Sequence, residues 1–399
     1  MQTLIKIVLT TMVAAVIFTV GAGAGFAMRD YWADDQPPPQ AEQDLALYWE
    51  VWNRVREQFY GGVPPDANTT YGAIKGSLAT LNDPYTVFLE PEPAAQEKAQ
   101  LEGQFGGIGA FVQQNEAGEI VLNPMRGQAA EKAGLLEGDV LLAVDGADIL
   151  PEMSIEDVVN LIRGEVGTPV ALTVRRQGET DPVELTIVRA IIETPSADWR
   201  LLEQDPTIGY IQLRAFTERS SDEINDAFDE LITQGAKSFI FDLRGNGGGL
   251  LDAAVNIASQ FLRDGVVVKE DRQGEGERVY NVHSGGKALD QPVVVLVNGG
   301  TASASEIVAG ALQDTGRATL IGEKTFGKGS VQLIYELSDH SRLHVTVAKW
   351  FTPNGNAIDG TGLQPDIESL FTEDDRANGR DPQLERAIEF LQNREYAGK

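Results

Sequence analysis

The chain has 399 residues, with 32 Lys and Arg against 60 Asp and Glu, three His and no Cys. Its formal net charge of −28 argues against nucleic acid as a partner, because a strongly acidic surface repels phosphates. The lack of Cys excludes disulfides, thiolate metal sites and a cysteine nucleophile. His283, His340 and His344 leave little material for a His-based metal site or a Ser-His-Asp triad. The length predicts two or three domains.

The N-terminal segment predicts export. An uncharged run from Ile7 to Met28 covers 22 residues, which is long enough to span a bilayer as a helix. Gly25-Phe26-Ala27 also resembles a loose signal-peptidase site. We therefore interpret residues 1–30 as a membrane anchor or a cleaved signal peptide. Either one places the rest of the chain outside the cytoplasmic membrane, anchored in the cell envelope or free in the periplasmic or extracellular space.

A Pro-rich polar spacer over 31–43 follows. Apolar side chains at helical spacing then predict an amphipathic helix over 44–60, and a second short helix over 71–81 ends before Asp83-Pro84. The many aromatic side chains on these helices require a partner surface, which is either the chain's own body or a second subunit. A homodimer through the N-terminal helices is one such arrangement.

Short alternating segments come next and predict strands over 107–113, 119–122, 140–144, 170–175 and 183–189, with helices over 129–133 and 155–162. The pattern then changes to alternating strands and helices, which is typical of a layered α/β core. The predicted core strands are 208–214, 238–242, 293–297, 330–337 and 344–351, and the predicted helices are 221–233, 250–262 and 305–314. Asp381-Pro382 opens a last helix that extends to about residue 391.

One strand-to-turn-to-helix junction carries a candidate nucleophile. The strand over 293–297 runs through Asn298-Gly299-Gly300-Thr301-Ala302-Ser303 into a helix. Such a junction exposes one side chain above a sheet, and small neighbours let a substrate backbone approach it. Read alone, the motif fits a helix cap at Ser303 or Ser305 better than a nucleophile.

A second glycine-rich junction follows the strand over 238–242. The turn Gly245-Asn246-Gly247-Gly248-Gly249 exposes backbone N–H groups, which is what an oxyanion hole requires. A plain tight turn or a phosphate-binding loop is the alternative. The turn lacks the Lys-Ser/Thr ending of a P-loop, and the acidic chain makes phosphate an unsuitable ligand.

A serine nucleophile needs a base, and none of the three His lies at a suggestive position. Lys328 is flanked by glycines in Thr325-Phe326-Gly327-Lys328-Gly329-Ser330 and precedes an apolar strand. Burial lowers the pKa of a lysine toward neutrality and lets it act as a base. In isolation, however, a lysine between glycines is typical of a solvated turn.

Taken together, these segments resemble the C-terminal processing peptidases, the Ser-Lys proteases of the tail-specific family. The resemblance is carried by Phe241-Asp242-Leu243-Arg244-Gly245-Asn246-Gly247-Gly248-Gly249-Leu250, Thr301-Ala302-Ser303-Ala304-Ser305-Glu306 and Thr325-Phe326-Gly327-Lys328-Gly329-Ser330-Val331-Gln332. It extends to Gly72-Ala73-Ile74-Lys75-Gly76, Asp83-Pro84-Tyr85 and Gly362-Leu363-Gln364-Pro365-Asp366, and so covers nearly everything after the N-terminal segment. Gly247 departs from the pattern, because many relatives carry Pro or Ser there.

The resemblance implies a role for each matching residue. Ser303 is expected to be the nucleophile, Lys328 the general base and Gln332 the residue that orients the lysine. The oxyanion hole is expected to consist of the N–H groups of Ala304 and Gly248, with Gly249 as the alternative to Gly248. No metal or organic cofactor is implied.

The region of alternating strands resembles a PDZ domain. Phe105-Gly106-Gly107-Ile108-Gly109 is similar to its carboxylate-binding loop, and Gly134-Leu135-Leu136-Glu137-Gly138-Asp139 matches a turn typical of these modules. In such a loop consecutive N–H groups bind a terminal carboxylate, and the following strand pairs with the peptide. A plain small barrel is the alternative interpretation.

These observations predict a multidomain α/β protein with a layered core similar to ClpP and crotonase. The expected segments are a signal or anchor over 1–30, a linker over 31–43, a helical region over 44–100, a PDZ domain over 101–190, a peptidase core over 191–370 and a C-terminal helical segment over 371–399. The expected activity is cleavage of exported proteins near their C-termini, with the PDZ domain binding an apolar tail and gating the core. The rival interpretations are an inactive PDZ adaptor and a crotonase-like acyl-transfer enzyme, although an export segment argues against a coenzyme A substrate.

Overall fold

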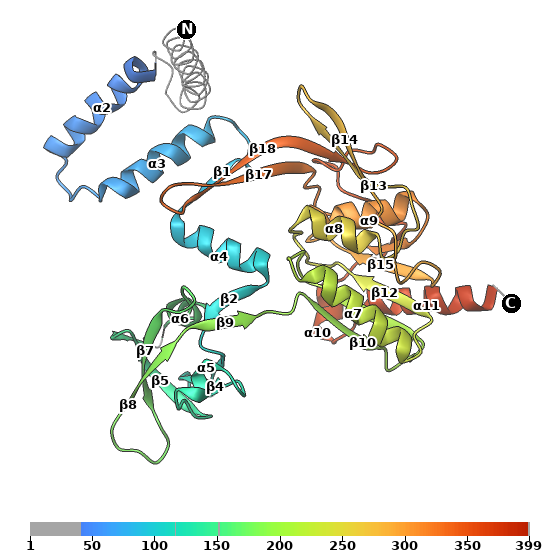
Figure 1. The fold of residues 1–399 in the computed structure, drawn as a ribbon, viewed down its shortest axis with the longest axis horizontal. Helices are drawn as coiled ribbons and strands as arrows, with labels where there is room; N and C mark the ends of the chain where they lie inside the picture. The colour runs from blue at the N-terminus through green and yellow to red at the C-terminus, as the bar shows by residue number, and fades with distance from the viewer. Residues whose placement is uncertain (1–40, 116, 151, 398–399) are drawn as a thin grey trace, which may run out of the picture. The chain divides into compact units, whose positions relative to one another are not determined.

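A computed structural model describes residues 41–397 with the exception of 116 and 151 (Figure 1). The anchor or signal predicted over 1–30 and most of the linker over 31–43 therefore lie outside the described residues. Within residues 41–397, none of the helices is long and apolar enough to cross a membrane. The chain divides after Gly72 into two units.

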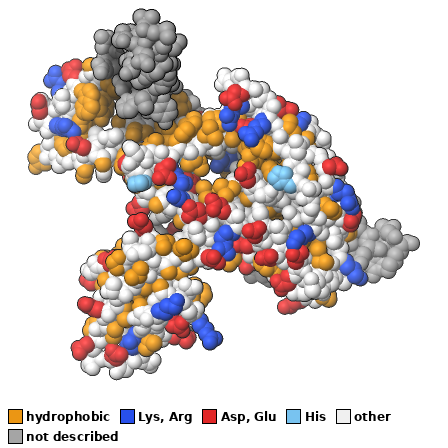
Figure 2. Space-filling model, viewed as in Figure 1, with side chains coloured by type: hydrophobic (Ala, Val, Ile, Leu, Met, Phe, Trp, Pro, Cys, Tyr) orange, Lys and Arg blue, Asp and Glu red, His pale blue; other side chains and the backbone are white. Residues whose placement is uncertain are grey.

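The first unit contains helix α2 (Ala41–Gln58) and the beginning of α3 (Asp66–Ala79). The predicted helix over 44–60 is thus confirmed with slightly different ends. Helix α3 begins five residues before the predicted start, directly after Pro64-Pro65, and inside it the Thr70 hydroxyl donates to the Asp66 carbonyl. Arg56 and Asp66 form an ion pair between the two helices. Apolar side chains gather on the surface of this unit (Figure 2), and the exposed ones on α2 include Leu47 and Trp49.

The first lobe of the second unit consists of short antiparallel strands around a small apolar core. The main sheet has the order β3 (Ala110–Gln114), β4 (Ile120–Pro124), β5 (Asp139–Val144), β7 (Pro169–Arg175) and β8 (Val183–Val188), with β6 (Ala147–Asp148) beside β5. Strand β2 (Gln104–Gly107) pairs separately with β9 (Ala190–Glu193). Helices α5 (Ala129–Lys132) and α6 (Ile155–Ile162) close the lobe. The strand predicted over 107–113 is divided in two, because Gly109 adopts a positive φ of 72° and turns the chain.

The main core is a six-stranded sheet in the order β10 (Ala197–Leu201), β11 (Ile208–Leu213), β12 (Ser238–Asp242), β15 (Val293–Val297), β16 (Thr319–Gly322) and β19 (Ile367–Glu368). All of its pairings are parallel except that of β10 with β11. Alternate side chains of β12 and β15 face opposite layers, since Phe239 and Val295 join one apolar cluster while Ile240 and Val294 join the other. The layered α/β fold predicted from the sequence is therefore confirmed.

Helices cover both faces of this sheet (Figure 1). α7 (Ser220–Thr233), α8 (Leu251–Ala258) and α9 (Ala304–Asp314) pack against one face, and α11 (Pro382–Ala397) packs against the other. A second sheet has the order β1 (Val87–Leu89), β18 (Arg342–Phe351), β13 (Val266–Arg272) and β14 (Gly276–Asn281), and β17 (Ser330–Glu336) pairs with β18 along its other edge. Helix α4 (Pro91–Glu102) runs from this sheet to β2.

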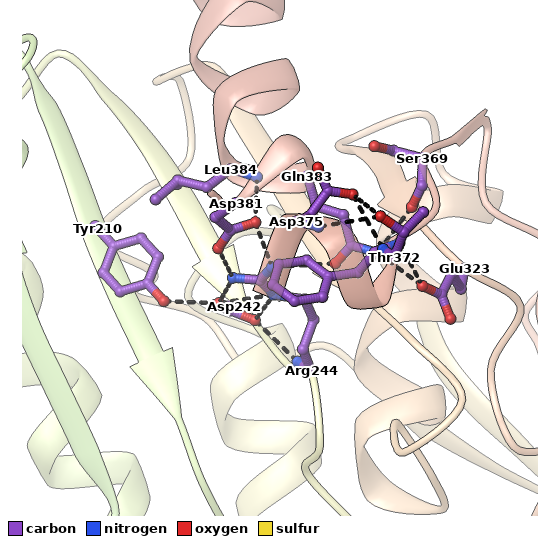
Figure 3. A network of polar contacts seen from close by, with 11 residues as sticks. Tyr210, Asp242, Arg244, Glu323, Ser369, Thr372, Asp375, Asp381, Gln383 and Leu384 are labelled. Atoms are coloured by element: carbon purple, nitrogen blue, oxygen red, sulfur yellow. Dashed lines mark hydrogen bonds and ion pairs between the residues drawn. The ribbon is translucent and has the colours of Figure 1, made fainter. Parts of the chain in front are cut away.

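A buried polar network fixes the C-terminal segment to the carboxyl end of β12 (Figure 3). Arg244 binds the fully buried Asp242 at 2.6 Å and the Asp381 carboxylate at 2.8 Å. The Tyr210 hydroxyl donates to Asp242 at 2.6 Å, and burial together with that carboxylate raises the pKa of Tyr210. Gln383 links Arg244 to Glu323 and the Ser369 carbonyl, near the short helix α10 (Glu373–Ala377). The network therefore holds the strand end from which the glycine-rich turn at 245–249 departs.

Candidate active site

Ser303 stands at the entrance of α9 in a strained backbone conformation. Its φ of 56° and ψ of −117° are unusual for a residue with a side chain. The side chain is half-buried, whereas Ala302 and Ala304 on either side are buried. The predicted strand-to-turn-to-helix junction is thus present, and its strain is of the kind that points a nucleophile away from the sheet.

The glycine-rich turn at 245–249 is joined to the Ser303 loop by several hydrogen bonds. The Asn246 carbonyl accepts the Ala302 N–H at 3.0 Å and the Ser305 hydroxyl at 2.9 Å. The Asn298 side chain accepts the Gly245 N–H at 2.9 Å, and the Thr301 hydroxyl donates to the Leu243 carbonyl. Ser305 is thus a structural link between the two loops.

Gly248 lies directly beside Ser303. A side-chain carbon at position 248 would come within 2.8 Å of Ser303 Cβ and 2.9 Å of the Ala304 nitrogen, so that a residue other than glycine does not fit. The φ of Gly248 is also 103°, which favours glycine. The Gly248 N–H donates to Asn246 Oδ1 at 2.9 Å in this arrangement. The two N–H donors predicted for an oxyanion hole are therefore neighbours, and one of them is engaged by Asn246.

Glu306 connects the Ser303 loop to the Lys328 loop. The side chain is fully buried, and its Oε2 accepts the N–H of Ser303 at 2.9 Å and the N–H of Lys328 at 2.8 Å. Its Oε1 accepts the Thr325 hydroxyl at 2.5 Å and the Gly327 N–H at 2.7 Å. Four donors thus satisfy one buried carboxylate, and they fix the backbone of both candidate catalytic residues to the same group.

Lys328 is partly buried, and this burial lowers the pKa of its ammonium group, while the Glu97 carboxylate acts in the opposite direction. Its Nζ lies 5.2 Å from the centre of the Tyr85 ring. The lysine is therefore not the solvated turn residue that its glycine neighbours alone would predict. A lowered pKa increases the neutral fraction that can accept a proton.

Gln332 lies on β17, four residues after Lys328, where its amide donates to the Ser330 hydroxyl at 2.8 Å and to Thr346 at 3.3 Å. The three His residues have partners outside the Ser303 and Lys328 loops. His283 contacts Asn256, His340 contacts Glu336 and His344 contacts Glu97.

A groove with a cavity of about 230 Å³ lies in the first lobe, between the β2–β3 segment and α6. Of the residues predicted to bind peptide, Phe105, Gly107, Ile108 and Gly109 line it. Gly106 instead packs against Gly164, since a side-chain carbon at 106 would lie 2.0 Å from the Gly164 carbonyl oxygen. Arg163 also lines the groove, with its guanidinium 4.0 Å from the centre of the Phe105 ring. The groove thus combines apolar walls with a cation.

Known proteins match both parts of this arrangement. Residues 207–369 match the model of peptidase family S41, and residues 120–176 match that of the PDZ domain. The carboxy-terminal-processing protease of Bartonella bacilliformis is 38% identical over 330 residues, which are 82% of this chain and 75% of that protein. This chain belongs to the carboxyl-terminal-processing proteases of family S41. It is accordingly a serine-type peptidase with a PDZ domain.

The chain is also similar to a second relative and to a solved structure. The carboxyl-terminal-processing protease of Synechocystis sp. is 38% identical over 360 residues, which cover 88% of this chain and 84% of that protein. A solved structure of an S41 protease from Bacteroides fragilis covers 85% of this chain and 94% of its own, with a TM-score of 0.50 and 18% identity. That last likeness concerns the fold alone.

Sequence reasoning missed three residues near the site. Glu306 stands three residues after Ser303, at the spacing of a capping box, and this spacing could have indicated that it binds the Ser303 N–H. Tyr85 was noted within a motif but received no role. Arg163 follows a predicted helix and carries no local pattern that separates it from a surface arginine.

We expect Glu306→Ala to reduce kcat/KM for peptide cleavage by about 10²-fold, because the loops that carry Ser303 and Lys328 lose their common anchor. The variant also leaves buried donors unpaired, which costs about 1–3 kcal/mol for each group, so the melting temperature falls as well. Glu306→Gln keeps the shape of the side chain, so its kcat/KM and its melting temperature should lie between those of the wild type and of Glu306→Ala. The exposed Glu336, whose carboxylate contacts His340, provides the control Glu336→Ala. Cleavage at the wild-type rate by Glu306→Ala would contradict this role.

Proposed function

We propose that the chain is an endopeptidase that cleaves exported proteins near their C-termini by a Ser-Lys mechanism. The observation that carries the proposal is the shared anchor: one buried carboxylate, Glu306, binds the backbone N–H of both Ser303 and Lys328. The strained conformation of Ser303 and the lowered pKa of Lys328 suit a nucleophile and a base, respectively. Membership in a family of processing proteases supports a polypeptide substrate.

In the proposed reaction, neutral Lys328 takes the proton from the Ser303 hydroxyl while Oγ attacks the scissile carbonyl. The N–H groups of Ala304 and Gly248 stabilise the resulting oxyanion, for which the Gly248 N–H must leave Asn246. The C–N bond then breaks, and the Lys328 ammonium gives its proton to the leaving amine. Water hydrolyses the ester on Ser303 and restores the free hydroxyl. Gln332 is proposed to orient Lys328 during these steps.

The PDZ groove is proposed to bind the substrate tail. N–H groups of the Gly107–Gly109 loop and the Arg163 guanidinium suit a terminal carboxylate, and the apolar walls of the groove suit an apolar tail. The strand β3 that follows the loop can pair with the peptide backbone.

We propose that tail binding gates the core. Two expected catalytic groups are engaged elsewhere, since Gly248 N–H binds Asn246 and the Gln332 amide binds Ser330 and Thr346. Helix α4 provides a connection, because it leads into β2 at the groove and its Glu97 contacts Arg342 and His344 on β18. A change at the groove can thus reach the sheet that holds β17.

Export and assembly belong to the same proposal. The apolar run from Ile7 to Met28 supports export, with the segment either retained as an anchor or removed. The exposed apolar side chains of α2, including Leu45, Leu47 and Trp49, support a homodimer through the N-terminal helices.

The proposal is tested with an unfolded reporter protein that ends in an apolar tail and with the same reporter carrying a C-terminal amide. Residues 30–399 should cleave the first reporter, and the amide should raise KM, because it removes the charge that the groove binds. Arg163→Ala should raise KM about tenfold for the free acid and have little effect on the amide, since a charge-assisted hydrogen bond contributes about 1.5–3 kcal/mol. Tail binding without cleavage would instead favour the inactive adaptor. Equal cleavage of both reporters would contradict tail capture.

A further inference from the structure

The turn before β1 is fixed to the sheet that carries the Lys328 loop. The Asp83 carboxylate accepts the Tyr85 N–H at 3.1 Å and the Thr86 hydroxyl at 2.7 Å. Thr86 Oγ1 in turn accepts the Thr346 N–H at 3.1 Å, and Thr346 pairs with Gln332 of β17. These bonds place the Tyr85 ring at a defined position relative to the strand that follows Lys328.

The Tyr85 ring contacts the Lys328 side chain. Lys328 Nζ lies 5.2 Å from the ring centre, within the range of a cation–π interaction. Burial and the carboxylates of Asp359, Glu306 and Asp83 raise the pKa of the Tyr85 phenol, so the ring stays uncharged at neutral pH. No hydrogen bond joins Nζ to Ser303 or to the Gln332 amide within the described part of the chain.

A cation–π contact stabilises the ammonium form of a lysine but not its neutral amine. A general base must be neutral before it accepts a proton. The contact therefore opposes the role proposed for Lys328. It also keeps Nζ above the ring, although the base must contact the Ser303 hydroxyl during the reaction.

We propose that Tyr85 is a positioning residue that holds the Lys328 side chain over its ring as the ammonium ion, so that the catalytic arrangement forms only when this contact is released. The proposal rests on the proposed function, because it concerns the proposed base. The charged groups facing this pair are Glu97 from α4, Glu306 from α9, and Asp359 and Asp83 from loops. Glu97 also favours the ammonium form, but it is bound by Arg342 and His344 as well.

Two variants separate the ring face from the phenol hydroxyl. Tyr85→Phe keeps the ring and removes the hydroxyl, whereas Tyr85→Leu removes the ring and keeps an apolar cover over Lys328. Loss of a cation–π contact of about 0.5–1 kcal/mol corresponds to a two- to fivefold change in the ammonium-to-amine ratio. We expect Tyr85→Leu to cleave about two- to fivefold faster below the pKa of Lys328. The acid limb of its kcat/KM profile should move to lower pH, while Tyr85→Phe should keep the wild-type profile.

A direct titration of Lys328 keeps this test separate from the proposed function. The Lys328 signal is followed by NMR of ¹³Cε-labelled lysine and assigned with Lys328→Arg. A wild type that cleaves no reporter would count against the proposed function, and the titration would still decide the role of Tyr85. A lower Lys328 pKa in Tyr85→Leu than in Tyr85→Phe supports the proposal. Equal pKa values, or an acid limb that moves to higher pH in Tyr85→Leu, would overturn it.

Discussion

Ser303→Ala and Lys328→Arg should each lower the rate of peptide cleavage by at least about 10³-fold. The first variant lacks the hydroxyl that forms the ester. The second keeps a long cationic side chain, but a guanidinium is not deprotonated in proteins and cannot act as the base. The rates are measured on the apolar-tailed reporter, at saturating and at low reporter concentrations.

A neighbouring serine provides the matched control for this experiment. Ser305 is fully buried, and its hydroxyl bonds the Asn246 carbonyl, which also accepts the Ala302 N–H. Ser305→Ala should therefore lower the rate by less than about tenfold, because the Asn246 carbonyl still accepts the Ala302 N–H. Loss of cleavage in Ser305→Ala with retention in Ser303→Ala would reverse the assignment of the nucleophile.

Arg244→Ala should lower the free energy of unfolding by about 3–5 kcal/mol, because it leaves the buried Asp242 carboxylate without its cation. The same change removes the ion pair of Arg244 with Asp381, which leaves Asp381 with the Leu384 N–H and so weakens the attachment of the start of α11 (Figure 3). Since Arg244 stands four residues before Gly248, we also expect slower cleavage. Thermal and denaturant unfolding measure the loss of stability.

Two further variants check the cause of that loss. Adding Asp242→Asn to Arg244→Ala removes the uncompensated charge and should recover part of the stability. Arg380 pairs with Asp375 and Glu385 at the surface, so Arg380→Ala should cost less than about 1 kcal/mol. Equal losses from Arg244→Ala and Arg380→Ala would show that the buried network is no more important than a surface ion pair.

The elements of the core with a strong apolar pattern could be predicted with accurate boundaries. Strands β12 and β15 and helix α6 match their predicted ranges, because each has a run or period of apolar residues that ends at a polar or glycine-rich turn. Strands β13 and β14 were missed, since a segment such as Val266–Arg272 ends in four consecutive charged residues, which are typical of a loop. β13 pairs with β14 and with β18, and this pairing stabilises the segments as strands. Pairing between distant segments cannot be predicted from the local sequence.

In the candidate site, too, some features could be predicted from the sequence and others depend on contacts between distant segments. Gly248, Ala304 and Ser303 could be assigned to one site through the resemblance to the C-terminal processing peptidases, and the structure shows that Gly248 lies directly beside Ser303 and Ala304. The contact of Tyr85 with Lys328 joins residues 243 positions apart in the chain, and only the folded sheet shows it. The buried position of Glu306 likewise depends on the two loops, carrying Ser303 and Lys328, that meet at the start of α9.

The central claim is that Ser303, activated by Lys328, forms the covalent intermediate. The most direct measurement is to react the enzyme with a serine-directed fluorophosphonate and to locate the adduct by peptide mass mapping. We expect one adduct on Ser303 in the wild type, none at that position in Ser303→Ala, and much slower formation in Lys328→Arg. An adduct on another residue, or labelling of Ser303 at an unchanged rate in Lys328→Arg, would contradict this claim.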